Sequence, residues 1–206
     1  MASNIPATAL TLFPLQAVLF PGGLLSLKVF EPRYVDLVTT CLREQRPFGV
    51  VALKATREAR RTEDGQHFET TGTLAELIDV DSERSGILQV RCHGVQRFVV
   101  LRSEAQADGL WQAETRLLPH DALLAPPPAL LEAVRGLASA IASLKGRGSA
   151  PFLAPHRFDD TGWVANRWCE ILPISTVAKQ RLMELPDPMV RLQLVDDFLR
   201  SRGVVK

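Results

Sequence analysis

Apolar and polar residues alternate along much of the first 120 residues, which is the pattern of strands with one face in a core and the other toward water. Turn-forming residues stand between these runs, as at Gly94 and Asp108–Gly109. The pattern predicts six strands, over 25–29, 48–53, 73–80, 87–92, 97–101 and 111–117. Strands this short favour a barrel or a sandwich, because an open sheet would leave unprotected edges.

One segment within this region has helical spacing instead. Pro32 suits the first position of a helix, where its missing N–H costs nothing. The apolar residues that follow recur at intervals of three and four: Tyr34, Leu37, Val38, Cys41 and Leu42. We expect this inserted helix to pack its apolar stripe on the sheet or across one end of a barrel.

The chain changes character near residue 120. The segment 121–128 (DALLAPPP) is interpreted as a linker, because consecutive prolines interrupt strands and helices and favour an extended, stiff chain. The predicted organisation is therefore a β-rich part over residues 1–120, the proline-rich linker over 121–128, and a helical part over 129–206.

Helical period dominates this last part, first from Leu130 to Leu144 and then from about Asp160 to Leu172. Two more helices follow, the last of them opened by Pro188. Three side chains are placed to cap helices by accepting hydrogen bonds from main-chain N–H groups: Asp160, Ser175 and Asp187. Four helices with short connections predict a small bundle.

Composition and charge are those of an ordinary globular chain, with 46% hydrophobic and 23% charged residues and a net charge of +1. A charge this close to zero argues against a nucleic-acid partner. The basic run at 57–61 (REARR) is followed by acidic residues and is typical of a solvated hairpin tip.

The compartment follows from what the chain lacks. No apolar run approaches the roughly 20 residues of a membrane helix, and the first residues do not resemble a secretory signal. The three cysteines, Cys41, Cys92 and Cys169, form no CxxC pair. We expect a cytoplasmic protein with reduced thiols and no membrane partner.

The usual sequence signatures of catalysis are absent. The chain has no GxxxxGK[ST], GxSxG, HExxH or GxGxxG pattern, so a phosphate cradle, a serine nucleophile elbow and a zinc site are not indicated. Cys92 and His93 are adjacent, but neighbours in a strand point to opposite faces and cannot form a nucleophile–base pair. We therefore predict neither enzymatic activity nor a cofactor or metal.

Four segments near the start carry a family resemblance: LFPL at 12–15, VLFPG at 18–22, LSL at 25–27 and FEPRY at 30–34. Together they resemble the opening of the Lon protease N-terminal (LON substrate-binding) domain family, which reads "FPL…V.FPG…LPL.IFEPRY". Ser26 and Val29 are mild departures from it. Later motifs extend the resemblance from about residue 10 to 200: GTLA at 72–75, GVQRF at 94–98, LPI at 172–174 and KQRL at 179–182.

The resemblance implies an α+β fold, with a PUA-like β-barrel that contains the inserted helix and a C-terminal four-helix bundle. Because the sequence ends at Lys206, we expect a stand-alone bacterial version without ATPase or protease domains. The implied function is non-catalytic recognition of unfolded or specific protein and peptide substrates, as an adaptor that could serve a separate protease. Two alternatives stay open, a PUA-like domain that binds RNA or a small molecule, and a hydrolase without recognisable motifs.

The matched motifs also supply the candidate binding residues. Because lone charges are costly to bury, Glu31, Arg33 and Arg97 are candidates for lining a binding groove, together with Tyr34. The alternative is that these charges pair with one another or cap the helix start. The aromatic residues of the motifs fit a core: Phe13, Phe20, Phe30, Tyr34 and Phe98.

Overall fold

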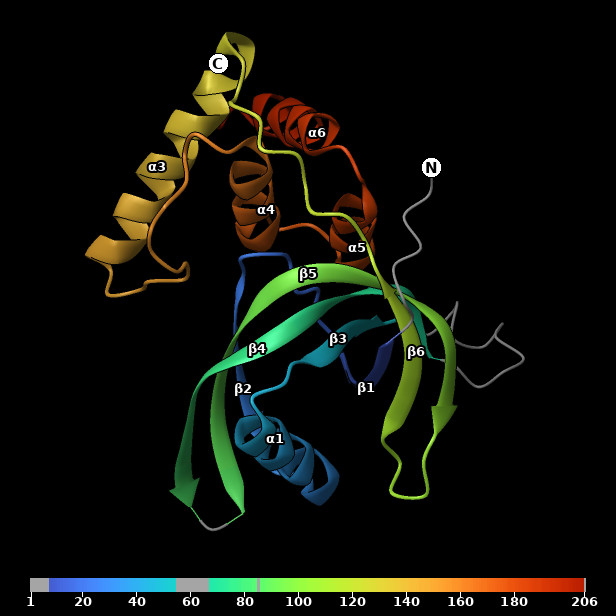
Figure 1. The fold of residues 1–206 in the computed structure, drawn as a ribbon. Helices are drawn as coiled ribbons and strands as arrows, with labels where there is room; N and C mark the ends of the chain where they lie inside the picture. The colour runs from blue at the N-terminus through green and yellow to red at the C-terminus, as the bar shows by residue number, and fades with distance from the viewer. Residues whose placement is uncertain (1–7, 55–66, 85, 206) are drawn as a thin grey trace. The chain divides into compact units, whose positions relative to one another are not determined.

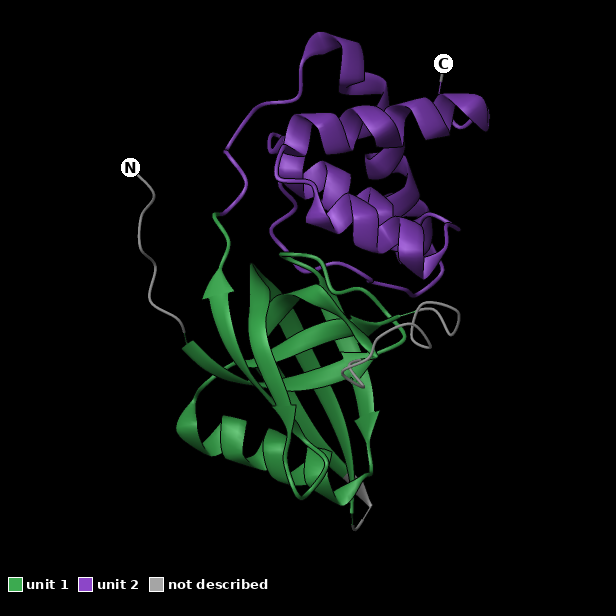
Figure 2. Cartoon of the chain, turned by 90° about the vertical axis from the view of Figure 1, so that its right-hand side faces the viewer, with its two compact units in different colours: residues 1–119 green, residues 120–206 purple. Residues whose placement is uncertain are grey.

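The computed structural model describes residues 8–54, 67–84 and 86–205 (Figure 1). The chain divides into two compact units, Met1–Pro119 and His120–Lys206 (Figure 2). Unit 1 contains all the strands of the described residues and one helix, and unit 2 is helical, so the predicted α+β class is confirmed. The basic run at 57–61 lies outside the described residues.

The strands of unit 1 form a six-stranded sheet of order β2-β5-β4-β3-β1-β6 (Figure 1). Their bounds are β1 Thr8–Leu15, β2 Leu24–Val29, β3 Phe48–Leu53, β4 Phe68–Arg84, β5 Ile87–Ala105 and β6 Trp111–Leu117. Strands β1 and β3 pair in parallel, and the other pairs are antiparallel. Because β6 also pairs with β5, strands β5, β4, β3, β1 and β6 form a closed circuit of hydrogen-bonded neighbours.

The strand predictions differ from the structure in two places. Strand β1 was not predicted, and the two strands predicted at 87–92 and 97–101 are one continuous strand, β5. Gly94 does not form a turn between them. Its N–H donates to the Gly23 carbonyl at 2.9 Å, its carbonyl accepts from the Gly22 N–H at 2.7 Å, and a Cβ here would collide with the Phe20 carbonyl. Glycine is required because the segment before β2 approaches the β5 backbone closely.

Helix α1 (Pro32–Glu44) has Pro32 in its first turn, as predicted. Its residues Tyr34, Leu37, Val38 and Cys41 are buried against Phe13, Val29, Phe48, Val90 and other apolar residues of the sheet. Leu42, expected in the same stripe, is 53% exposed. A second cluster forms within the sheet around Leu12, Val51, Phe68 and Phe98.

Unit 2 contains a 3₁₀ turn (η1, Pro128–Leu130) and the helices α3 (Leu131–Gly146), α4 (Thr161–Ile171), α5 (Thr176–Glu184) and α6 (Pro188–Ser201). All three predicted caps are confirmed. Asp160 accepts from the Gly162 N–H at 2.9 Å, Ser175 from the Ala178 N–H at 3.2 Å, and Asp187 from the Met189 N–H at 2.8 Å. No helix in the described part of the chain is long and apolar enough to cross a membrane.

The proline-rich segment is held against the helices of unit 2. The buried Arg191 of α6 donates to the Asp121 carboxylate at 2.6 Å and to the Asn166 side-chain carbonyl at 2.9 Å. The Thr161 N–H donates to the Leu124 carbonyl at 2.8 Å. Residues 121–124 are therefore fixed to α4 and α6.

Candidate binding site

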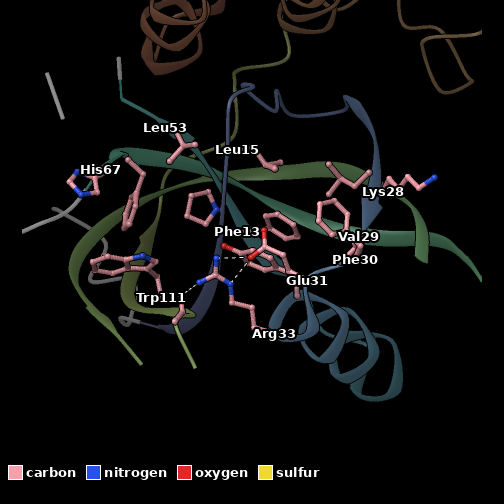
Figure 3. A pocket seen from close by; sticks show the side chains of 15 residues that line it. Phe13, Leu15, Lys28, Val29, Phe30, Glu31, Arg33, Leu53, His67 and Trp111 are labelled. Atoms are coloured by element: carbon pink, nitrogen blue, oxygen red, sulfur yellow. Dashed lines mark hydrogen bonds and ion pairs between the residues drawn. The ribbon is translucent and has the colours of Figure 1, made fainter. Parts of the chain in front are cut away.

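Unit 1 contains a cavity of about 450 Å³ whose lining comes from β1, β2, the start of α1, and the ends of β3, β4 and β6 (Figure 3). In Figure 3, Lys28 and Val29 lie on one side of it, and His67 and Trp111 lie on the other. Segments far apart in the sequence thus meet around one concave surface.

The walls of the cavity are rich in aromatic side chains: Phe13, Phe30, Tyr34, Phe68 and Trp111. Phe13 stacks on Tyr34 with 4.0 Å between ring centroids and 12° between ring planes. Phe68 and Trp111 meet edge to face at 5.1 Å. These contacts pack the rings of each pair against one another and hold them in place along the walls.

Phe30 differs from the other aromatic residues of the matched motifs. It is 64% exposed, so its predicted place in the core was wrong. It comes directly after Val29, which ends β2 and is only 2% exposed. The Phe30 ring therefore lies on the lining of the cavity, where a bound molecule can reach it.

An ion pair lies beside the aromatic rings. Arg33 donates to Glu31 Oε2 from Nη2 at 2.8 Å and from Nε at 3.0 Å. Its third bond runs from Nη1 to the Gly109 carbonyl at 2.9 Å, and the guanidinium lies 4.8 Å from the centroid of the Tyr34 ring. The side chain of Glu31 makes no cap bond to α1, so of the two structural roles considered for it, pairing is the one that the structure shows.

Gly109 allows Arg33 to reach across to the β5–β6 turn. Its φ of +81° is in the left-handed region, and a Cβ at this position would lie 2.5 Å from Arg33 Nη1. Asp108 supports the turn by accepting from the Leu110 N–H at 2.9 Å. The predicted Asp-Gly turn therefore has a second role: through the Gly109 carbonyl it joins the β5–β6 hairpin to Arg33 at the start of α1.

Tyr34 is neutral at neutral pH, and its surroundings favour the protonated form further. Burial raises the pKa of its hydroxyl above the usual 10.0, nearby Arg33 lowers it, and Glu31 raises it again. A neutral phenol beside a neutralised ion pair leaves the inner wall with little net charge. The exposed Lys28 contributes a positive charge at the rim.

The structure separates the four candidate residues. Glu31, Arg33 and Tyr34 line the same cavity. Arg97 is only 5% exposed and lies opposite Thr73 in the β4–β5 ladder, and it does not line this cavity. Sequence reasoning missed Phe68 and Trp111, because nothing local indicates that the ends of β4 and β6 meet the segment 30–34.

The Cys92–His93 pair behaves as strand geometry predicts. Cys92 is fully buried, and burial raises the pKa of its thiol to about 12. His93 points to the other side, where its Nε2 lies 3.7 Å from the Glu76 carboxylate. Within the residues that the structure describes, no cluster of three or more His, Cys, Asp or Glu side chains could hold a metal ion.

Comparison with known proteins identifies the family. Residues 9–201 match the family model described as the ATP-dependent protease La (LON) substrate-binding domain. The chain is 33% identical over 146 residues to protein cereblon of Gallus gallus, covering 69% of this chain and 29% of that protein. It is 28% identical over 205 residues to the Lon protease of Paraburkholderia phytofirmans, covering 97% of this chain and 25% of that protease.

Solved structures agree with these relatives. The crystal structure of a Lon N-terminal domain protein from Xanthomonas campestris superposes with a TM-score of 0.70 at 31% identity, covering 91% of this chain and 96% of that one. By contrast, the chain spans less than a third of the length of the cereblon and Lon relatives that it matches.

Proposed function

We propose, from the premise that this chain belongs to the ATP-dependent protease La (LON) substrate-binding domain family, that it is a non-catalytic domain that recognises protein or peptide substrates. The observation that carries the proposal is the cavity of about 450 Å³ in unit 1. Binding sites are typically concave and largely apolar with a few placed polar groups, which describes aromatic walls beside one ion pair.

The residues support binding rather than catalysis at this site. The ionisable groups on its lining are Lys28, Glu31, Arg33, His67 and Tyr34. Glu31 and Arg33 are engaged with each other, and Tyr34, whose usual pKa of 10.0 is raised further by burial, holds its proton at neutral pH. The family likeness does not favour the RNA-binding or small-molecule alternative.

The same premise supports a finer description of the fold. We infer that the circuit of strands β5, β4, β3, β1 and β6 is a PUA-like barrel, because each of these strands has a neighbour on both sides. We infer a four-helix bundle in unit 2, where Trp168 of α4 donates from Nε1 to the Ala133 carbonyl of α3 at 2.8 Å. Units 1 and 2 are then two subdomains of one recognition module.

The partner protein is the second part of the proposal. A recognition module acts in proteolysis by presenting its substrate to a protease, and we propose that this chain does so for a separate one. The cytoplasm is the proposed compartment, because all three cysteines are free and buried.

The test is a titration with an unfolded protein. We expect reduced and carboxymethylated ribonuclease to bind and folded ribonuclease not to bind. Phe30→Ser should weaken this binding about tenfold, because it removes an exposed ring from the lining. Leu101→Ser is the matched control: it removes a 47% exposed apolar side chain of β5 that does not line the cavity, so binding should not change.

Two results would contradict the proposal. One is no binding of the unfolded protein at concentrations on the order of tens of micromolar. The other is an equal loss of affinity in the Phe30 and Leu101 variants, which would place the contact outside this cavity.

A further inference from the structure

The cavity lies where the pairing of strands is incomplete. The ladder between β1 and β6 ends at Leu12 and Trp111, so in the described residues the segment 13–15 of β1 pairs with β3 alone. Among the strands that the structure describes, β2 likewise pairs with β5 alone and forms an edge of the sheet. Both segments line the cavity, with Phe13 and Leu15 from β1 and Lys28 and Val29 from β2 (Figure 3).

The two edges differ in the main-chain N–H and C=O groups that they present for hydrogen bonding. The Gly94 N–H bonds to the Gly23 carbonyl, and main-chain bonds alternate along an antiparallel pair. The main-chain N–H and C=O groups of Leu25, Leu27 and Val29 therefore point toward β5. Those of Leu24, Ser26 and Lys28 point away from it. The β1 segment contains Pro14, which has no N–H, so β2 is the better edge for hydrogen bonding.

We propose that the site binds its substrate as an extended strand that adds to the edge of β2 and places alternate side chains in the aromatic cavity. This proposal rests on the proposed function and names the form in which the substrate is recognised. Groups spaced along a strand edge match the main chain of an extended peptide, whereas a helix has already used its own. Side chains of an added strand alternate, so every second residue reaches the apolar walls.

Strand geometry narrows the substrate further. Only every second side chain of an added strand faces the apolar walls, and the peptide needs an N–H wherever its main chain bonds to β2. The preferred substrate is thus an extended segment with alternating large apolar residues and no proline at a bonded position.

The test uses a short synthetic peptide in which Phe and Leu alternate with Thr, flanked by Gly and Ser. The peptide is N-methylated at one residue at a time, which removes a main-chain N–H and leaves the side chain unchanged. We expect N-methylation to lower the affinity about fivefold to tenfold at every second residue and to change it little at the residues between, because only alternate N–H groups face β2. A flat response along the peptide would overturn the proposal.

Two variants of the protein test the main-chain hydrogen bonds that β2 would contribute. Ser26→Pro removes an N–H directed away from β5, at an exposed position in an edge strand, where proline is tolerated. It should weaken peptide binding about tenfold, while Ser26→Ala, which keeps the N–H, should bind like the parent. Equal affinity of the two variants would count against strand addition, and circular dichroism confirms that each is folded.

The outcomes separate this proposal from the one on which it rests. If the peptide binds and loses affinity in Phe30→Ser but shows no alternation, the cavity is a binding site and strand addition is wrong. If neither the peptide nor unfolded ribonuclease binds, the proposed function itself fails.

Discussion

At the scale of single residues, Arg33 organises the candidate site. Its guanidinium joins Glu31 at the start of α1 to the Gly109 carbonyl in the β5–β6 turn, and it lies over the Tyr34 ring. Three contacts from one planar group fix its orientation, which a lysine ammonium could not reproduce. The residue that allows this arrangement is the glycine, since any side chain there would meet the guanidinium.

Gly109→Ala should therefore destabilise the protein in two ways. Alanine at a φ of +81° costs about 1 kcal/mol in backbone strain, and its Cβ displaces Arg33 from the carbonyl, which costs about 1 kcal/mol more. Gly86→Ala is the matched control, because Gly86 has a φ of +80° and nothing within 4 Å of the added Cβ. Denaturant unfolding measures both, and equal losses would show that the Arg33 contact contributes nothing.

At the scale of elements, the ends of helices are set by local side chains. Ser175 and Asp187 each accept main-chain N–H bonds at the start of the helix that follows them. Strand ends are set differently. Strand β5 runs past Gly94 because it has partners from β2, β4 and β6 along its length, so pairing overrides the local turn signal.

Helix α4 supplies a prediction on pH. Burial raises the pKa of Glu170 from 4.5 to about 7, against the pull of Arg167 at 2.6 Å. The folded state then holds a proton that the unfolded state has lost between these pH values. The free energy of unfolding should fall by at most about 3 kcal/mol as pH rises from about 4.5 to about 7. Above this range it should stay level.

Glu170→Gln removes the titrating group and keeps an oxygen that can accept from Arg167. The difference in free energy of unfolding between the parent and this variant should change across that pH window and be constant above it. Chemical denaturation at a series of pH values measures the difference. A constant difference throughout would show that folding leaves the pKa of Glu170 at its unfolded value.

At the scale of the whole molecule, the chain forms two units with different kinds of core. Unit 1 is held by apolar contacts between α1 and the sheet. Unit 2 contains a buried arginine whose partners come from several segments, since Arg191 joins Asp121, Asn166 and the carbonyls of Leu182 and Leu185. One side chain thus connects the proline-rich segment to three helices.

Arg191→Ala should destabilise unit 2 by about 3–5 kcal/mol, because it removes a buried partner of the Asp121 carboxylate. Arg135→Ala is the control: its pair with Glu132 is exposed, and its loss should cost less than about 1 kcal/mol. Tryptophan fluorescence reports mainly on unit 2, which contains Trp163 and Trp168. Similar unfolding midpoints for the two variants would contradict a structural role for Arg191.

Sequence alone determined the features that depend on neighbours along the chain. Hydrophobic period indicated most strands and the helices, and Asp160, Ser175 and Asp187 marked helix starts because a cap acts within three residues. The matched motifs also identified the family, and three of the four candidate residues line the cavity: Glu31, Arg33 and Tyr34.

Tertiary structure decided everything that depends on strand register. Whether residue 33 meets residue 109, or Phe68 meets Trp111, follows from how β4, β5 and β6 pair, and local period carries no information about that. The pairing of β4 with β5 also places Arg97 away from the cavity, whereas Phe30, which follows the end of β2, is exposed on its lining. The open edge of β2 also exists only in the assembled sheet, because an edge is defined by the strand that is missing beside it.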